Sequence, residues 1–325
     1  MSEQQHGEAP DPERGRDATR VGDIPPSGWK DVLSRVRRRA RDNNLSLASA
    51  GVAFYALIAT FPGLLSVWGI YGLVFDPGQQ TNQLAFLQGQ LQPEAMYLLV
   101  ALIRGLSQAD RSHLGFGVAG GALLTLWGAS LGVRTLMSAL NVAYGEREKR
   151  SLLARLAVAL LLTLGAIAVA FCIGLALVGL PVLSQWWRLS PVWHRLIFYG
   201  RWPAVGALFW LSLLVFYRYG PSRTAARWSW VSWGGLVATA LWLSGSGILA
   251  WYVAGSARYH QAYGSVAAIV LVLAWFLLSA FSVVLGAEIN AELERQTRRD
   301  TTVGNEKPIG ERGASAADDL GGSLS

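Results

Sequence analysis

The sequence predicts an all-α, polytopic membrane protein, a bundle of six transmembrane helices with both ends of the chain on one side. Two observations lead to this fold class: six long stretches are almost free of charge, and basic residues gather in alternate loops between them. A helix rises about 1.5 Å per residue, so about 20 apolar residues cross a hydrocarbon core of about 30 Å. The composition agrees, because only 15% of the 325 residues are charged and 52% are hydrophobic.

The apolar stretches divide the chain into one membrane domain and two tails. The spans are expected at about residues 45–74, 114–134, 156–181, 197–217, 228–254 and 264–287, within a domain covering residues 29–295. The polar composition of residues 1–28 and 296–325 predicts two disordered cytoplasmic tails. The fourth span is the weakest, because Arg201 interrupts it near one end, and we expect this side chain to reach the outer interface.

The basic residues predict how the chain is oriented. They cluster before the first span and after the second, fourth and sixth: Lys30, Arg35, Arg37, Arg38, Arg39, Arg41, Arg147, Lys149, Arg150, Arg155, Arg218, Arg223, Arg227, Arg295, Arg298 and Arg299. This alternation places both termini in the cytoplasm. The net charge of +7 is therefore mainly an orientation signal, with anionic lipid contact by the cluster at 35–41 as a secondary interpretation. Nucleic-acid binding is disfavoured, because no aromatic or glycine-rich recognition pattern accompanies the charges.

Two local features qualify the simple picture of six straight helices. After Pro93, the first outer loop places Met96, Leu99, Ile103 and Leu106 at helical spacing, which predicts a short amphipathic helix on the outer surface. This helix is expected either to pack as a lid on the bundle or to act as a gate that contacts lipid or substrate. Pro62 is expected to kink the first span, because proline removes a backbone donor and clashes with the preceding turn.

The second span has a polar stripe on one face. Ser130, Arg134, Ser138 and Asn141 recur at helical spacing in the half of the span nearer the cytoplasm. A charged group near the hydrocarbon boundary is costly unless it is paired or hydrated. Arg134 is therefore a candidate for holding an anionic headgroup.

The end of the sixth span places two further polar groups at a comparable depth, Glu288 and Asn290. Arg134 and Glu288 are accordingly candidate partners across two helices, with Glu288 and Asn141 ordering the headgroup that Arg134 would hold. The alternative is that Arg134 reaches phosphate headgroups alone and that Glu288 simply faces water.

The residues argue against an enzyme. The histidines are scattered over a tail and three outer loops, so they do not have the spacing of a metal site: His6, His113, His194 and His260. The sequence has neither a phosphate-binding loop for ATP nor a serine nucleophile elbow. Its one cysteine, Cys172, lies inside the third span. We therefore expect no catalytic residue, no metal and no cofactor.

Three short segments resemble the YihY/virulence factor BrkB family. They are the run Asn-Leu-Ser-Leu-Ala-Ser-Ala-Gly-Val-Ala-Phe-Tyr-Ala-Leu at 44–57, Leu-Asn-Val-Ala-Tyr at 140–144, and Gly-Ala-Glu-Ile-Asn-Ala at 286–291. The resemblance implies a six-helix protein of the bacterial inner membrane. Members were once labelled ribonuclease BN, an activity that the residues above disfavour. The family pattern also highlights several positions in this sequence: Tyr55, Pro62, Asn141, Glu288 and Asn290.

The function predicted from these features is the transport or binding of an amphipathic, lipid-like envelope molecule, with an anionic lipid as one candidate. The candidate binding residues are Arg134, Glu288, Asn141, Ser138, Asn290 and Tyr55. Membrane lipids are the expected partners, with envelope proteins or further copies of the chain as alternatives. A non-transporting scaffold or envelope-assembly partner is the main competing function. An ion channel is less favoured, because no span shows a ring of acidic or carbonyl ligands.

Overall fold

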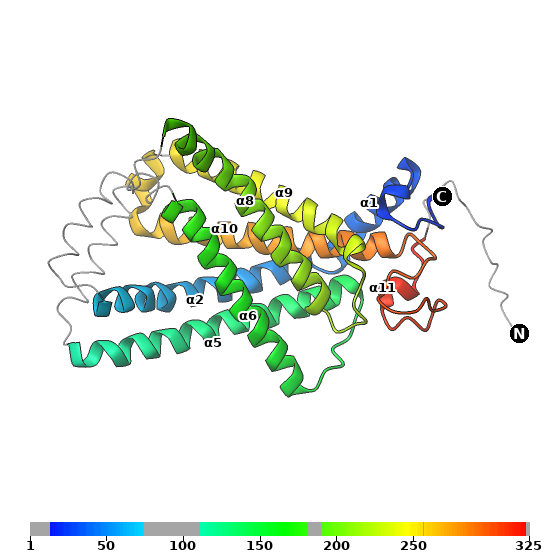
Figure 1. Ribbon diagram of the computed structural model, residues 1–325, viewed down its shortest axis with the longest axis horizontal. Coiled ribbons are helices and arrows are strands. Elements are labelled where there is room, and N and C mark those ends of the chain that lie inside the picture. The colour runs from blue at the N-terminus through cyan, green and yellow to red at the C-terminus, as the bar shows by residue number, and fades with distance from the viewer. Residues whose placement is uncertain (1–13, 75–110, 181–189, 256, 323–325) are drawn as a thin grey trace, which may run out of the picture.

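The computed structural model describes residues 14–74, 111–180, 190–255 and 257–322. It is a bundle of long helices that lie roughly along one axis, and the first and last described segments, near residues 14 and 322, lie at the same end of the bundle (Figure 1). We call this end the terminal end.

The described residues contain six helices that are long and apolar enough to cross a membrane. The helices are α2 (Leu45–Val74), α5 (Arg111–Tyr144), α6 (Leu152–Gly174), α8 (Pro191–Tyr219), α9 (Trp228–Gly255) and α10 (Ala257–Glu294). The predicted fold class of six helical spans is therefore confirmed. The helix of the weakest span begins earlier than expected, at Pro191, because proline is well suited to the first turn of a helix.

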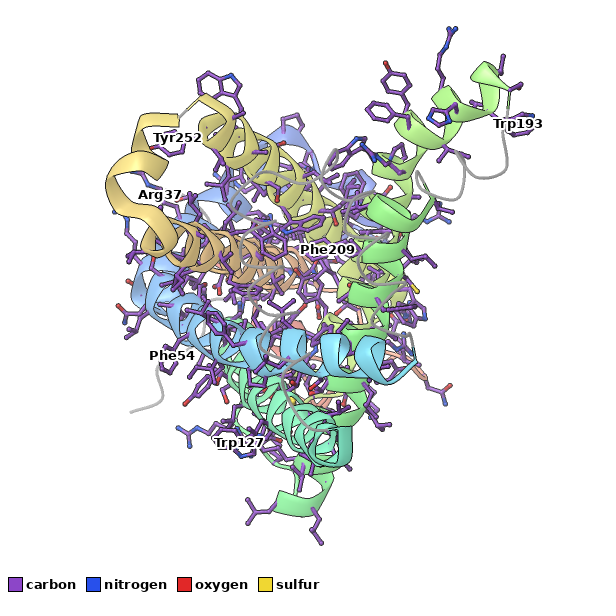
Figure 2. All side chains as sticks on the ribbon, turned by 90° about the vertical axis from the view of Figure 1, so that its left-hand side faces the viewer. Arg37, Phe54, Trp127, Trp193, Phe209 and Tyr252 are labelled. Atoms are coloured by element: carbon purple, nitrogen blue, oxygen red, sulfur yellow. The ribbon has the colours of Figure 1, made fainter. Side chains whose placement is uncertain are left out.

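The six helices pack unevenly. α2 lies against α5 over most of its length, α10 contacts both of these helices and α9, and α6 crosses obliquely from α5 to α8 (Figure 1). Apolar side chains such as Phe54, Trp127 and Trp193 point outward and are more than half exposed (Figure 2). A surface of this kind is suited to lipid, since lipid chains are as apolar as the side chains that they contact.

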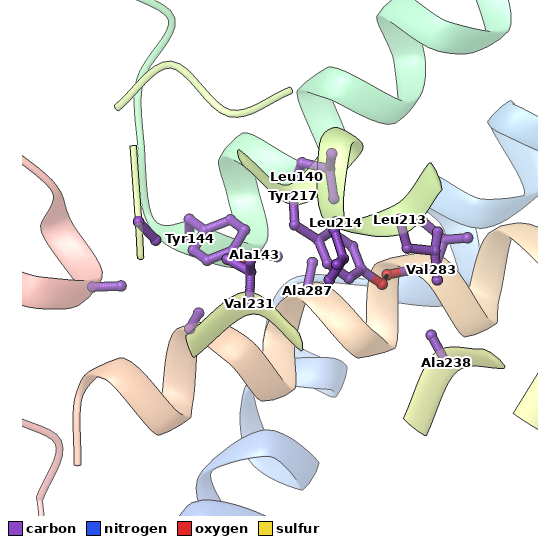
Figure 3. Packing of buried hydrophobic residues seen from close by; sticks show 13 residues of the cluster. Leu140, Ala143, Tyr144, Leu213, Leu214, Tyr217, Val231, Ala238, Val283 and Ala287 are labelled. Atoms are coloured by element: carbon purple, nitrogen blue, oxygen red, sulfur yellow. Dashed lines mark hydrogen bonds between the residues drawn. The ribbon is translucent and has the colours of Figure 1, made fainter. Parts of the chain in front are cut away.

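The core at the terminal end depends on a close approach of α9 and α10. Gly234 and Gly286 face each other so closely that a Cβ added to Gly286 would lie 2.6 Å from the carbonyl oxygen of Gly234. Beside this contact, the Tyr217 hydroxyl donates a hydrogen bond of 2.8 Å to the carbonyl of Val283 (Figure 3). The neighbouring Leu140 and Tyr144 are fully buried, so α5, α8, α9 and α10 share one packed core here.

The terminal end is closed by segments for which the sequence analysis expects disorder. Helix α1 (Pro26–Asp42), the short turn η2 (Val21–Asp23) and the short helix α11 (Ser315–Asp318) fold against the ends of the spans. Residues of both predicted tails are buried, among them Val21, Thr301 and Ala316. The expected disorder therefore does not describe residues 14–28 or 296–322, because their polar groups find partners elsewhere in the protein.

Glu292 is the centre of a buried ionic cluster at this end. One of its carboxylate oxygens accepts from Arg35 Nε at 2.6 Å, and the other contacts Arg295 Nη1 at 2.7 Å and Arg39 Nε at 2.9 Å. Arg35 also donates to the side chain of Gln296 at 2.7 Å. The cluster joins α1 to the end of α10, and its three arginines are all among those that the sequence analysis treats as orientation signals.

Arg312 organises the C-terminal segment. Its buried guanidinium donates to four backbone carbonyls, including those of Ala317 at 2.7 Å and Lys307 at 3.1 Å. Arg312→Gln would leave several of these carbonyls without a donor. We expect cleavage at Glu306 by a glutamate-specific protease to become roughly tenfold faster, because local opening becomes easier. Arg147→Gln is the control, since Arg147 is an exposed arginine outside the C-terminal segment. Equal cleavage rates in the two variants would contradict this role of Arg312.

Three predicted features have different outcomes. The amphipathic helix of the first outer loop falls outside the described residues. Helix α2 continues past Pro62, whose carbonyl accepts from the Ser66 hydroxyl at 2.8 Å, and the kink at this proline stays a prediction. Arg201 Nη1 donates to the Leu177 carbonyl at 3.2 Å, within a turn of π-helix at Leu175–Gly179. The side chain therefore bonds to α6 backbone, a partner that the sequence analysis does not anticipate.

Candidate functional site

A cavity of about 260 Å³ lies between α5 and α6, toward the terminal end. We call it the α5–α6 groove. Its lining combines three polar residues of α5, one basic residue of α6 and three leucines: Leu131, Arg134, Thr135, Ser138, Leu152, Arg155 and Leu156. The lining residues of α5 follow the pattern i, i+3, i+4 and i+7 from Leu131, so they share one face of that helix.

Two guanidinium groups meet in the α5–α6 groove. Arg134 donates from Nε to the Ser130 carbonyl of its own helix at 3.3 Å, and it forms no ion pair with any residue that the structure describes. Arg155 donates from Nη2 to the Ser138 hydroxyl at 3.1 Å. Both side chains are half-buried. The groove therefore has a positive potential and spare donors on Arg134.

Glu148 moderates the charge of Arg155. Its carboxylate lies 3.9 Å from Arg155 Nε and accepts a hydrogen bond of 3.2 Å from the Asn141 amide. Partial burial acts to raise the pKa of Glu148, but hydrogen bonds from the Arg150 backbone, Ser222 and Asn141 outweigh it and keep that pKa below its ordinary value. Glu148 is thus anionic at neutral pH and holds Arg155 in place.

The remaining predicted residues lie elsewhere. Glu288 accepts from the Asn43 amide at 3.2 Å, and no ion pair with Arg134 is present among the described residues. Asn290 bonds the start of α9, accepting from the Gly234 amide at 2.8 Å and donating to the Val231 carbonyl at 3.0 Å. The proposed pairing of Arg134 with Glu288 is thus not formed, because each side chain has a nearer partner.

Asn141 and Tyr55 also lie outside the groove lining. The Asn141 oxygen accepts from the Ser222 amide at 2.7 Å, so the side chain connects the end of α5 to the loop between α8 and α9. The Cβ atom of Tyr55 lies where α2 passes Gly132 of α5. Of the six candidate binding residues, the structure therefore brings only Arg134 and Ser138 together in the groove.

Sequence reasoning missed Arg155 as a site residue. It counted this arginine among the orientation signals, because a basic residue at the start of a span has that role by default. The available signal was its place directly before the predicted third span, where a charge must find a partner or reach the interface. Which face of α5 it would meet depends on the oblique path of α6, which the sequence does not specify.

The apolar side of the α5–α6 groove is open. Leu152 is 84% exposed and Leu156 48% exposed, and both stand next to Arg155 in the first turns of α6. A molecule with a charged head and an apolar tail would match this lining, with the head beside the guanidinium groups and the tail along the leucines. The volume is slightly below that of a typical ligand pocket of about 300–1,000 Å³, so it suits a headgroup rather than a whole lipid.

The groove does not have the donor set of a metal centre. Among the residues that the structure describes, no three His, Cys, Asp or Glu side chains are placed to hold a metal ion. Arginines, a serine and a threonine instead match the oxygens of a phosphate or carboxylate.

Known proteins resemble the chain over most of its length. Residues 36–309 match the family described as virulence factor BrkB. The ribonuclease-like protein YfkH of Bacillus subtilis is 29% identical over 259 residues, a match that covers 77% of this chain and 90% of that protein. A UPF0761 membrane protein of Methylibium petroleiphilum is 28% identical over 281 residues, covering 81% of this chain and 62% of the relative.

A UPF0761 membrane protein of Verminephrobacter eiseniae is 24% identical over 280 residues, covering 84% of this chain and 64% of the relative. The chain thus spans less than two thirds of the length of the two UPF0761 relatives. No solved structure matches it. The family match covers residues 36–309, and the described residues contain six helices long and apolar enough to span a membrane. The chain therefore belongs to the virulence factor BrkB family of membrane proteins.

Proposed function

We propose that this chain binds the anionic headgroup of a lipid-like envelope molecule in the α5–α6 groove, as a step in transporting or retaining it. The observation that carries the proposal is the meeting of Arg134 and Arg155 in a cavity whose outer wall is exposed leucine. Two guanidinium groups present several donors to one phosphate, and such charge-assisted hydrogen bonds are the strong ones.

The depth of the groove supports a lipid ligand. Arg155 bonds Ser138, so these two residues mark one depth, and Arg134 lies one helical turn, about 5.4 Å, deeper into the span. An arginine at this depth is stabilised when an anionic group accompanies it. A lipid headgroup drawn toward Arg134 would leave the layer formed by the headgroups of the neighbouring lipids. This displacement is the first movement that a lipid transporter requires.

The proposal places the protein in the bacterial inner membrane with both termini in the cytoplasm. The support is the alternation of basic loops together with the position of both termini at one end (Figure 1). In this orientation the α5–α6 groove opens toward the cytoplasmic leaflet.

Lipid binding can be tested through the two arginines. We expect Arg134→Ala and Arg155→Ala each to weaken binding of short-chain phosphatidylglycerol to the purified protein at least tenfold, since each removes donors to a charged group worth about 1.5–3 kcal/mol. Arg147→Gln is the control, because Arg147 is exposed in the adjoining loop and does not line the groove. Titration calorimetry in a neutral detergent would measure all three. Unchanged affinity in the double Arg134→Ala, Arg155→Ala variant would refute the proposal.

We also propose that the protein is not a ribonuclease, although one relative is named ribonuclease-like. The support is the chemistry of the groove, where arginines and hydroxyl groups replace the clustered histidines and carboxylates of a metal-dependent nuclease. Purified protein is expected to leave single-stranded RNA intact with and without Mg²⁺. Cleavage that disappears in the double arginine variant would show that the groove acts on RNA instead.

A further inference from the structure

Helix α1 has two faces with different roles. Its inner face is buried and packs against α10 and the preceding segment, through Val32, Val36 and the ion pair of Asp31 with Arg14 at 3.2 Å. The outer face is exposed and basic, and its charged members are Lys30, Arg37, Arg38 and Arg41. At 100° per residue these four side chains fall on one side of the helix, opposite Val32 and Arg35.

The basic side chains of this outer face have no bonding partner among the described residues. Arg35 and Arg39 are bound by Glu292, whereas the side chains of Lys30, Arg37, Arg38 and Arg41 form no hydrogen bond or ion pair with the residues that the structure describes. Of the two acidic residues of α1, Asp31 is buried and Asp42 is the last residue of the helix. The folded protein therefore divides one basic cluster into a structural part and an unpartnered part.

The outer face also lies close to the membrane boundary. Helix α1 ends at Asp42, Asn43 and Asn44 turn the chain, and the first span begins at Leu45. Asn44 has a φ of 49°, a left-handed conformation that asparagine tolerates, so the turn is tight. Viewed along the long axis of the bundle, Arg37 lies near its rim (Figure 2). A helix that ends directly before a span lies next to the level at which that span would leave the hydrocarbon core.

An exposed leucine lies among the charges. Leu33 is 56% exposed and falls between Lys30 and Arg37 on the helix surface. Basic residues flanking an apolar side chain are typical of helices that lie on an anionic membrane surface. Four to eight basic residues next to a span are also the usual composition of a segment that attracts anionic lipids.

We infer that the outer face of α1, formed by Lys30, Leu33, Arg37, Arg38 and Arg41, docks on the anionic headgroups of the membrane in which the bundle is embedded. This surface is separate from the α5–α6 groove, and it does not depend on the proposed function of that groove. Because α1 is tied to α10 through Glu292, docking would hold the whole terminal end at the level of the headgroups.

The docking can be tested with a spin label at Leu33. The full chain with Cys172→Ser and a nitroxide on Leu33→Cys is placed in nanodiscs of phosphatidylcholine, with and without about one third phosphatidylglycerol. We expect the accessibility of the label to a water-soluble nickel reagent to fall at least twofold in the anionic discs. The fall should disappear in 0.5 M NaCl, since salt screens surface charge.

Variants separate this inference from the groove proposal. Replacing Lys30, Arg37, Arg38 and Arg41 with glutamine should abolish the difference between the two lipids, and these exposed side chains contribute no contact that folding requires. Arg134→Ala should leave the difference unchanged. Equal accessibility in both lipids would overturn the inference, as would protection that survives in the four-residue variant. Protection that appears only in discs holding two copies would instead assign the face to contacts between chains.

Discussion

Glu292→Gln is expected to lower the free energy of unfolding by about 3–5 kcal/mol. Glu292 is fully buried and accepts from three arginines, two of which are themselves almost fully buried. Removing its charge would leave the guanidinium groups of Arg35 and Arg295 without the carboxylate that compensates for their burial. The penalty is the uncompensated burial of those charges, and it exceeds the worth of the bonds themselves.

A thermal midpoint in mild detergent would measure this loss, with size-exclusion chromatography reporting the folded fraction. Glu306→Gln is the matched control, because its pair with Arg299 is 3.7 Å long and both side chains are more than half exposed. Surface pairs of this kind contribute about 0–1 kcal/mol. If Glu292→Gln and Glu306→Gln shift the midpoint equally, the buried cluster is not what holds α1 to α10.

Gly286→Val is expected to prevent α9 and α10 from packing, with a loss of folded protein rather than a modest shift in stability. A Cβ at this position would lie 2.6 Å from the Gly234 carbonyl oxygen and 2.8 Å from the Cβ of Ala238, and it would also overlap the Tyr217 hydroxyl. The atoms that would have to move include backbone of a neighbouring helix, which cannot rotate away as a long side chain could. Overpacking usually costs about 1–3 kcal/mol, and backbone contact puts this case at or above the upper limit.

Gly247→Val in α9 is the control, because a Cβ there would meet no atom within 4 Å. We expect this variant to be produced and to elute like the parent, whereas Gly286→Val should aggregate when solubilised. The milder Gly286→Ala should show an intermediate thermal midpoint. Normal folding of Gly286→Val would mean that the two helices can separate at this point without loss of the core.

The spans could be predicted from the sequence because hydrophobic length is a local property. Each of the six helices can be located from its own residues, and even the doubtful fourth span follows once Pro191 is accepted as its first turn. The closed terminal end could not be predicted in this way. Residues 296–322 are polar and contain five glycines, a composition that resembles a disordered tail.

Their order depends on partners far away in the chain. The carbonyl of Gly322 accepts from Arg35, and the amide of Thr224 donates to the carbonyl of Gly313. Contacts of this kind leave no periodic signal in the sequence.

Local hydrogen bonds also order this segment. The amide and hydroxyl groups of Thr302 and the amide of Lys307 all donate to the Asp300 carboxylate. Burial acts to raise the pKa of Asp300, but these hydrogen bonds outweigh it and hold that pKa below its ordinary value.

The candidate site was half predictable for a similar reason. Helical spacing identified Arg134 and Ser138 as residues of one face, and the α5–α6 groove contains both. Depth alone suggested Glu288 as a partner, but depth does not determine which faces of α5 and α10 meet. Arg155 belongs to another helix and reaches Ser138 only because α6 crosses α5 obliquely.

The meeting of the two chain ends sets an order for biosynthesis. Arg16 donates to the carbonyl of Gly321, and Arg35 to that of Gly322, so residues made first wait for residues made last. The hydrophobic segments can enter the membrane during translation, yet Arg16 and Arg35 gain these acceptors only after Gly321 and Gly322 have been synthesised. A nascent polypeptide stalled before Gly321 would thus contain all six apolar helices while both arginines still lacked these two carbonyls.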